Sequence, residues 1–302
     1  MTALAALLTA VATPFFTAAA VGTWHGLVAS DGSRVTIPAA RFGGLDLSPD
    51  RRSTVAPAGP AAIWLRGRRL ATPGRTSLPV FAPNGRVVYG AGTAIRVVGG
   101  ASIRPQLPVG SRIVEIAVAR DAYAATVESG NGKAGTLRNA LYLVQGTRTR
   151  RLVAGFDAYS ERPHPEFSPD GRMIAFEKAG DVWVTDRAGE TTQISRTKVA
   201  SETGARWSPD GTRLAYTSGR HGINEVYVAT LDGRETRLTH TKPVGPDVPQ
   251  TGSMMGAWSP DGTTIAFTSY NAIATVPAAG GPRTVIRTFE PAAQTYLGPI
   301  WW

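Results

Sequence analysis

Four histidines are the side chains best suited to proton transfer or metal binding, because imidazole titrates near neutral pH and ligates metals. They are His25, His164, His221 and His240. No two of them lie at the i, i+4 spacing of a helical metal site, and none has a carboxylate beside it in a metal-binding pattern. The chain has no cysteine, which excludes thiolate metal sites and disulfides. We therefore expect no metal and no cofactor, although loops of one fold can still bring distant histidines together.

Three aspartates that recur in the same short phrase could instead bind calcium. Asp170, Asp210 and Asp261 lack companion carboxylates at ligand spacing, so the oxygen ligands that calcium needs are missing. We interpret each Asp side chain as the cap of its own turn. The sequence also lacks the Gly-x-Ser-x-Gly elbow of a serine hydrolase, a phosphate-binding glycine loop and a nucleotide-binding fingerprint. These absences favour a protein without catalytic residues over an enzyme.

Each of these aspartates lies in a Ser-Pro-Asp-Gly turn, with an aromatic residue before it and an apolar run after it. Proline at the second position presets φ and glycine at the fourth tolerates positive φ, which is typical of a type I β-turn. The flanking apolar residues predict two antiparallel strands joined by that turn. The turn residues of the three copies are Ser168, Pro169, Asp170 and Gly171; Ser208, Pro209, Asp210 and Gly211; and Ser259, Pro260, Asp261 and Gly262.

The hairpin recurs about every 40 residues, which is the period of a four-stranded propeller blade. Degenerate copies precede the three clear ones and are marked by Asp50, Asn84 and Asp121. Asp50 is followed by Arg51 where glycine is expected, and the copy at Asp121 is the weakest. We therefore predict an all-β propeller of four-stranded antiparallel blades.

The two ends of the chain supply the parts of one further blade. Residues 298–302 match the strand before the Ser-Pro-Asp-Gly turn, whereas residues 24–29 and 34–37 match the second hairpin of a blade. Pairing of the N- and C-terminal strands would remove unpaired sheet edges. We predict seven blades closed in this way and a single domain over residues 22–302. Six blades are the alternative if the copy at Asp121 is misread.

The Trp/Phe-Ser-Pro-Asp-Gly turn, the Ile-Ala-Phe strand and the Val-Tyr-Val strand with its Asp-Gly turn resemble the WD-like repeats of TolB-type β-propellers. The resemblance is clear over residues 163–240 and 256–288 and weak over residues 42–153. It implies the propeller fold but selects no function, because the repeat residues build turns and strands. Proteins with this propeller include periplasmic binding and scaffold proteins, sensor ectodomains and the substrate-gating domains of prolyl-oligopeptidase-type peptidases.

The N-terminal segment, residues 1–20, is almost wholly apolar and uncharged, and it ends in three small residues, Ala18, Ala19 and Ala20. This pattern is typical of a secretory signal peptide, although no Lys or Arg precedes the apolar run. An N-terminal membrane anchor and a buried strand are the alternatives, because Pro14 interrupts a helix and the run is short for a span. We expect an exported protein, periplasmic or extracellular, with no further membrane span.

The net charge is +10, and the basic residues are nearly all arginine. A polyanion-binding surface is one interpretation, and a GC-rich genome that encodes arginine in place of lysine is the other. The arginines are scattered without interleaved aromatic residues, so the sequence does not favour nucleic acid as a partner.

Binding residues tend to lie on long loops held by a rigid scaffold, and three loops of this repeat are unusually long. They cover residues 128–139, 156–165 and 241–255, and a shorter loop covers residues 218–224. Solvent-exposed insertions without function are the alternative interpretation. The ligand-binding residues predicted on these loops are Tyr159, Arg162, His164, Arg220, His221, His240 and Lys242.

The function hypothesis that follows is a monomeric, non-catalytic exported binding or scaffold protein. Its loop face would bind a protein or peptide partner or an anionic ligand. A propeller enzyme of the lyase or hydrolase type, using His164 or His221 with an arginine, is the second hypothesis. A sensor ectodomain held by an uncleaved N-terminal segment is the third.

Overall fold

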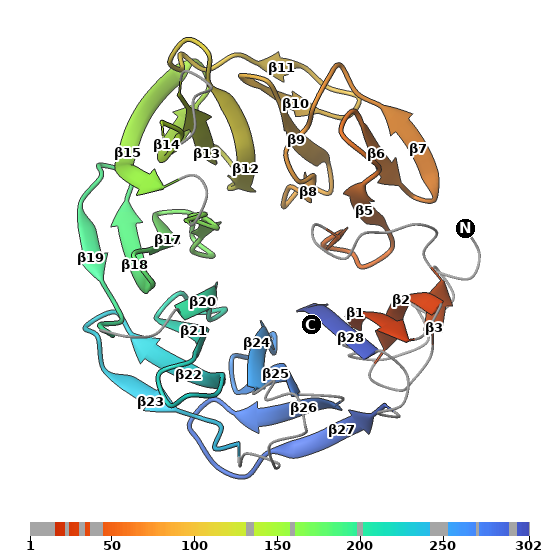
Figure 1. Ribbon diagram of the computed structural model, residues 1–302, viewed down its shortest axis with the longest axis vertical. Coiled ribbons are helices and arrows are strands. Elements are labelled where there is room, and N and C mark those ends of the chain that lie inside the picture. The colour runs from red at the N-terminus through yellow and green to blue at the C-terminus, as the bar shows by residue number, and fades with distance from the viewer. Residues whose placement is uncertain are drawn as a thin grey trace. The chain divides into compact units, whose positions relative to one another are not determined.

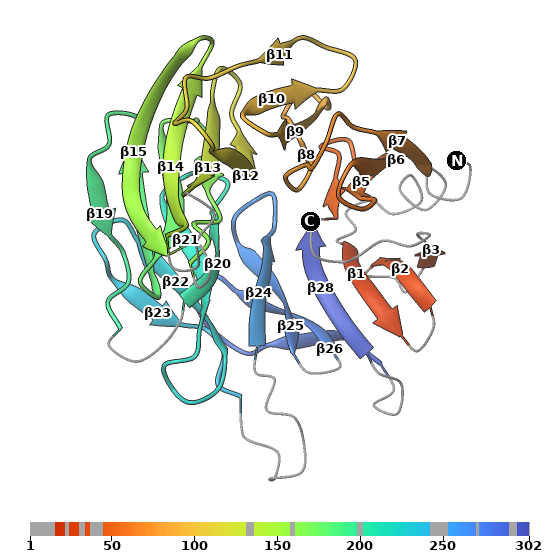
Figure 2. The same cartoon turned by 45° about the horizontal axis from the view of Figure 1, so that its top comes forward.

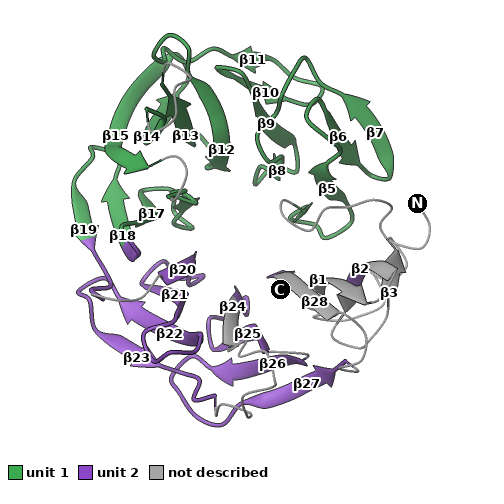
Figure 3. Cartoon of the chain, in the orientation of Figure 1, with its two compact units in different colours: residues 1–5, 39–179, 183–192 green, residues 6–38, 180–182, 193–302 purple. Residues whose placement is uncertain are grey.

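The computed structural model describes residues 16–21, 24–29, 34–36, 45–130, 136–157, 161–197, 202–241, 253–269, 272–289 and 295–301. Its strands form four-stranded antiparallel sheets built from consecutive hairpins (Figure 1). No helix among the described residues is long and apolar enough to span a membrane. The chain divides into two compact units (Figure 3). This architecture confirms the prediction of an all-β fold of four-stranded antiparallel blades.

Unit 1 covers residues 1–5, 39–179 and 183–192 and contains most of four blades. In the tilted view of Figure 2 its third blade stands out by its long strands, of which the outermost has 10 residues. The blades are β4 (Asp46–Leu47), β5 (Thr54–Pro57), β6 (Ala62–Leu65) and β7 (Arg68–Ala71); β8 (Val80–Phe81), β9 (Val87–Ala91), β10 (Ala94–Val97) and β11 (Ser102–Ile103); β12 (Arg112–Val118), β13 (Tyr123–Ser129), β14 (Arg138–Gln145) and β15 (Arg148–Asp157); and β16 (Glu166–Phe167), β17 (Met173–Lys178), β18 (Asp181–Asp186) and β19 (Thr191–Gln193).

Unit 2 covers residues 6–38, 180–182 and 193–302 and contains the other blades of the described chain. They are β20 (Glu202–Trp207), β21 (Arg213–Ser218), β22 (Glu225–Thr230) and β23 (Glu235–Arg237); β24 (Ser253–Trp258), β25 (Thr264–Ser269), β26 (Ala272–Pro277) and β27 (Thr284–Thr288); and β28 (Thr295–Trp301) with β1 (Phe16–Val21), β2 (Trp24–Ala29) and β3 (Arg34–Thr36).

Strands from the two ends of the chain share the last of these sheets. β28 pairs antiparallel with β1, and Thr17 lies opposite Ile300. The N-terminal part thus supplies β1 as well as the hairpin predicted over residues 24–37. β1 lies largely within the segment predicted as a signal peptide, which agrees with the strand alternative for that segment. The number of blades in the whole molecule and its closure stay predictions.

The Ser-Pro-Asp-Gly phrases form the hairpin turns that their residue types predict. In the first clear copy, the Gly171 N–H donates to the Ser168 carbonyl at 2.8 Å, and Gly171 has φ of 72°. Asp170 Oδ1 accepts from Ser168 Oγ at 2.6 Å and from the Arg172 N–H at 3.0 Å. The same contacts recur at Asp210 and Asp261. The interpretation of the repeated aspartate as a cap of its own turn is therefore correct.

Asp121 has a different role from the other marker aspartates. The hairpin that it marks exists, and the Ala119 N–H donates to the Ala122 carbonyl at 2.9 Å across a tight turn. The Asp121 carboxylate accepts two hydrogen bonds from the Arg187 guanidinium, at 2.7 and 2.8 Å. This bidentate ion pair joins the third blade of unit 1 to the fourth.

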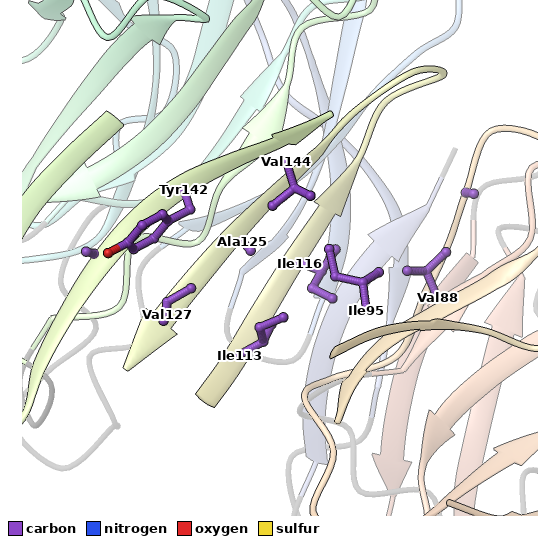
Figure 4. Close-up of a cluster of buried hydrophobic side chains, with 10 residues drawn as sticks. Val88, Ile95, Ile113, Ile116, Ala125, Val127, Tyr142 and Val144 are labelled. Atoms are coloured by element: carbon purple, nitrogen blue, oxygen red, sulfur yellow. The ribbon is translucent and has the colours of Figure 1, made fainter. Parts of the chain in front are cut away.

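The core of unit 1 lies between the faces of neighbouring blades. Figure 4 shows Val88 and Ile95 from one blade directed towards Ile113 and Ile116 of the next, and all four are buried. The second strand of a blade is therefore largely buried, as in β9 and β13, whereas the outermost strand is exposed, as in β7. The sequence predicts this gradient, because only the outermost strands carry mostly polar residues.

Two glycines allow neighbouring blades to approach closely. In unit 1, a Cβ atom added to Gly90 would lie 2.7 Å from Ile113 Cγ2 of the next blade. In unit 2, a Cβ added to Gly256 on β24 would lie 2.6 Å from Ile300 Cδ1 on β28. Real carbon atoms do not approach so closely, so both positions need a residue without a side chain.

Candidate functional site

A pocket of about 140 Å³ in unit 1 is lined mainly by polar and basic side chains. It lies between the segment that leads into β8, the start of β12 and the segment that precedes β16. Its lining residues are Arg75, Thr76, Ser77, Leu78, Arg112, Ile113, Val114 and Arg162. Three guanidinium groups around one small cavity are suited to an anionic group, because arginine binds carboxylate and phosphate through a planar fork of donors.

A β-bulge in β12 shapes one wall of the pocket. Ile113 lies opposite Val127 and Glu115 lies opposite Thr126, so Val114 has no partner in β13. Bulges redirect side chains at the ends of sheets and are common beside functional sites. On the opposite wall, Ser77 is fixed to the neighbouring strand, because its Oγ accepts from the Gly90 N–H at 2.7 Å. Both walls therefore belong to the hydrogen-bonded frame of the blades.

The three arginines of the pocket differ in how far they are neutralised. Arg112 Nε donates to Glu128 Oε1 at 2.7 Å, so its charge is balanced within β12 and β13. Arg75 and Arg162 are exposed, and neither forms an ion pair or hydrogen bond with any described residue. Arg75 has no carboxylate partner among the described residues, and Arg162 acts on the Glu115 carboxylate only through its charge, so both guanidiniums keep donors for a bound anion.

Glu161 and His164 hold the segment that carries Arg162 at both ends. The Glu161 carboxylate accepts the backbone N–H groups of Asp157 and Ala179, each at 3.1 Å. His164 Nδ1 lies 2.9 Å from Glu115 Oε1, and the His164 N–H donates to the other carboxylate oxygen at 3.3 Å. Arg162 lies between these anchors, so the pocket is preorganised on this side.

His164 has a backbone conformation that this repeat elsewhere gives to glycine. Its φ is 45°, and the equivalent bulge position in the β20–β23 blade is Gly204, with φ of 69°. His164 and Gly204 are equivalent because the residue before each makes the same pairing. The Glu177 N–H donates to the Pro163 carbonyl in one blade, and Thr217 pairs with Thr203 in the other. A non-glycine residue there costs about 1 kcal/mol or more, and such outliers concentrate at functional sites. The contact with Glu115 offsets that strain.

Glu115 is a buried carboxylate, with only 7% of its side chain exposed. Burial alone would raise its pKa, but the hydrogen bond and charge of His164, the hydroxyl of Thr126 and the charge of Arg162 together hold the pKa below its usual value of 4.5. Its ionised form is therefore the one that the fold stabilises.

The depressed pKa of Glu115 predicts a loss of stability in acid. A carboxyl whose pKa is lower in the folded than in the unfolded chain stabilises the fold above the unfolded pKa, and this contribution is lost as pH falls through the folded pKa. We expect E115Q to lower the melting temperature at neutral pH, and the difference from the unsubstituted protein to shrink below about pH 4.5. Melting curves from pH 7 to 3 test this; a difference that stays constant with pH would contradict it.

Arg220 and His221, both predicted to bind ligand, come together in unit 2. Arg220 Nη2 donates to Glu202 Oε1 at 2.6 Å, Nη1 donates to Glu235 Oε2 at 2.7 Å, and Cζ lies 4.3 Å from the centroid of the Tyr227 ring. The His221 ring stacks on Tyr227 at 6.4 Å between centroids. The guanidinium is engaged within its own blade, so this geometry favours a stabilising role for Arg220.

The other predicted site residues are not brought together by the structure. His240 is exposed and lies three residues after the end of β23. Tyr159 and Lys242 lie outside the described residues. The structure places Arg162 in the pocket of unit 1 and His164 beside it, and it keeps Arg220 and His221 in unit 2.

Sequence reasoning missed three residues of the site, namely Arg75, Arg112 and Glu115. Arg75 and Arg112 lie outside the long loops, and nothing in their spacing links them to Arg162. Glu115 could have been identified from the sequence, because it interrupts the apolar run of residues 113–118. A carboxylate within a buried strand needs a specific partner.

Comparison with known proteins supports the repeat. Residues 137–274 match the model of the TolB beta propeller domain. The chain is 32% identical over 151 residues to tricorn protease homolog 1 of Streptomyces coelicolor, covering 47% of this chain and 13% of that protein. It is 30% identical over 116 residues to the uncharacterized peptidase YuxL of Bacillus subtilis, covering 34% of this chain and 16% of that one. The chain thus matches only a small part of these relatives.

Solved structures extend the likeness to the fold as a whole. Prolyl oligopeptidase B from Galerina marginata aligns with a TM-score of 0.61 at 13% identity, covering 92% of this chain and 48% of that one. An oligogalacturonate lyase in complex with manganese aligns with a TM-score of 0.60 at 15% identity, covering 90% and 84%. Identity at this level supports the fold alone. The repeats, the four-stranded blades and the match over residues 137–274 agree in showing a likeness to the TolB beta propeller domain.

Proposed function

We propose that this protein is a non-catalytic binding protein and that the pocket of Arg75, Arg112 and Arg162 holds an anionic group of its ligand. One observation carries the proposal: Arg75 and Arg162 line the same cavity, and neither forms a hydrogen bond or an ion pair within 4 Å with a described residue. The anionic group would belong to a protein or peptide partner or to a small ligand. Each charge-assisted hydrogen bond to it would contribute about 1.5–3 kcal/mol.

Titration calorimetry with citrate and with inorganic phosphate tests the pocket. We expect binding that weakens about tenfold in R75A or R162A and about a hundredfold in the double variant, since each arginine supplies charge-assisted hydrogen bonds. R172A is the matched control, because Arg172 is an arginine of the same unit with 85% of its side chain exposed on a hairpin turn. The proposal fails if neither anion binds, or if the double variant binds as tightly as the control.

A specific observation also supports the second hypothesis, a propeller enzyme. His164 Nδ1 and Glu115 Oε1 are 2.9 Å apart beside the arginine pocket, and a carboxylate-held imidazole next to arginines suits general-base chemistry on an anionic substrate. Incubation with oligogalacturonate, the substrate named for a solved relative, tests this hypothesis. A new ultraviolet absorbance from an unsaturated product, lost in H164A, would favour the enzyme; no product at high protein concentration would favour binding alone.

We further propose that the protein is exported and that β1 remains part of it. The apolar N-terminal segment and the likeness to TolB-type propellers support export. Cleavage after Ala20 would remove all of β1 except Val21, and β1 is the partner of β28. Cell fractionation followed by N-terminal sequencing tests both points. A mature protein in the cytoplasm would contradict export, and one that begins after Val21 would contradict retention of β1.

A further inference from the structure

The longest strand that the structure describes, β15, has a strand partner on one side only. It has 10 residues, is the outermost strand of its sheet and pairs with no described strand other than β14 (Figure 2). The outermost strands of the other blades of unit 1, β7, β11 and β19, have 4, 2 and 3 residues. Proteins commonly keep edge strands short, because an unpaired edge is a template for another strand. β15 therefore differs from the other edge strands of its own unit.

Only the first part of β15 is regular. Residues 148–151 pair one by one with β14, whereas Leu152 and Gly155 have no partner there because the register shifts at each of them. Beyond the first shift, Lys178 Nζ also donates to the Ala154 carbonyl at 3.4 Å. The part of the edge that a further strand can extend is therefore residues 148–151.

The backbone of this part directs alternate N–H and C=O groups away from β14. A two-residue loop, residues 146–147, joins the two strands, so Gln145 and Arg148 form the first hydrogen-bonded pair. Such pairs alternate along an antiparallel ladder, which leaves the backbone groups of Thr149 and Arg151 directed outwards. No described residue forms a hydrogen bond with these outward groups. They are available to pair with the backbone of an added strand.

The same four residues carry three arginines, Arg148, Arg150 and Arg151, and all three are exposed. Arg150 Nη1 donates to the Ala188 carbonyl at 3.0 Å. Neither Arg148 nor Arg151 forms a hydrogen bond or an ion pair within 4 Å with a described residue. Asp157, at the far end of β15, is the only acidic residue of β14 and β15. The edge therefore combines unpaired backbone groups with positive charge.

These two properties together select one kind of partner. Outward N–H and C=O groups that alternate along a strand match the backbone of a peptide, whereas the phosphodiester backbone of a nucleic acid offers acceptors alone. A second copy of β15 is disfavoured, because antiparallel pairing would place Arg148 opposite Arg151, and like charges directly opposite each other destabilise a sheet. The arginines favour a strand that has carboxylates at the matching positions.

We infer that residues 148–151 form a docking edge for an extended acidic segment of a partner protein, which adds to the β12–β15 blade as a fifth strand. In recognition of this type, main-chain hydrogen bonds supply affinity and the alternate side chains supply specificity. None of these residues lines the arginine pocket, so the inference does not depend on the proposed function.

Fluorescence anisotropy with the labelled peptide Val-Glu-Glu-Thr-Glu-Val-Thr tests the inference. In antiparallel register its glutamates lie opposite Arg151, Arg150 and Arg148 in turn. N-methylation of the first glutamate and the first threonine blocks the N–H groups that face the edge, whereas N-methylation of the other two glutamates blocks N–H groups that face solvent. We expect the first modification to weaken binding at least tenfold, because it removes two hydrogen bonds, and the second to change it little.

Substitutions in the protein separate the docking edge from general charge. R148Q/R151Q should lower the affinity for the unmodified peptide about tenfold at low salt, because it removes two arginine–glutamate pairs. R68Q/R69Q is the matched control, because it removes two exposed arginines from β7, the outermost strand of another blade, and it should change little. The pocket variant R75A/R162A should bind the peptide like the unsubstituted protein.

Failure of the unsubstituted protein to bind the peptide would overturn the inference. Equal binding of the two methylated peptides would overturn it as well, because it would indicate attraction between charges without strand pairing. If R68Q/R69Q lost as much affinity as R148Q/R151Q, total charge would explain the binding. A similar loss in R75A/R162A would assign the peptide to the pocket instead.

Discussion

Replacing Arg220 with alanine should lower the free energy of unfolding by about 3–5 kcal/mol, because it leaves the buried carboxylate of Glu202 without a counterion. The Glu202 side chain is fully buried and that of Arg220 is 17% exposed. The substitution also removes the partner of Glu235 and the cation above the Tyr227 ring. Thermal unfolding followed by circular dichroism should show a melting temperature at least about 6 °C lower.

Arg234 provides the matched control in the same blade. It pairs with Asp232 at 2.9 Å, but 87% of its side chain is exposed, and exposed pairs contribute about 0–1 kcal/mol. R234A should therefore melt within about 2 °C of the unsubstituted protein. If R220A melted like R234A but lost ligand binding, Arg220 would be a ligand-binding residue, as the sequence alone suggested.

Replacing Gly256 with alanine should cost about 3 kcal/mol or more, because the new Cβ has no space. It would lie 2.6 Å from Ile300 Cδ1 and 2.8 Å from the Ala266 carbonyl oxygen, and a backbone carbonyl in a sheet cannot move aside. We expect a clearly lower melting temperature and less soluble protein on expression.

Gly219 is the control for this substitution. A Cβ added there would meet only Asn224 Oδ1, at 3.2 Å, and that side chain can rotate away. G219A should therefore retain most of the stability. Equal stability of G256A and G219A would contradict the close packing of β24 against β28.

The repeat was predictable from sequence because its turn chemistry is local. Serine, proline, aspartate and glycine each satisfy one requirement of the same turn. A hairpin is therefore predicted from Ser168 to Gly171 alone, whatever the rest of the chain contains. Arg51 and Asp121 were identified as departures from that pattern. Their consequences, a strained backbone and an ion pair with Arg187, depend on contacts that no local pattern encodes.

The candidate site was less predictable because its residues come from distant segments. Loop length pointed to the segment of Arg162 and His164, and Arg162 lines the pocket. Loop length says nothing about Arg75 and Arg112, which reach the same pocket from other strands and turns. Because Arg220 lies on a loop, the sequence also suggested that its guanidinium is free to bind a ligand. Its engagement with Glu202 depends on a buried carboxylate at the start of β20, which only the folded blade brings near.

Arginine-specific labelling with phenylglyoxal tests most directly whether the pocket holds an anion. The extent of modification at each arginine is measured by mass spectrometry, with and without saturating citrate. We expect Arg75 and Arg162 to be protected by citrate, while Arg172 and Arg234 react equally in both samples. Unchanged modification of Arg75 and Arg162, or equal protection of all four arginines, would contradict the account.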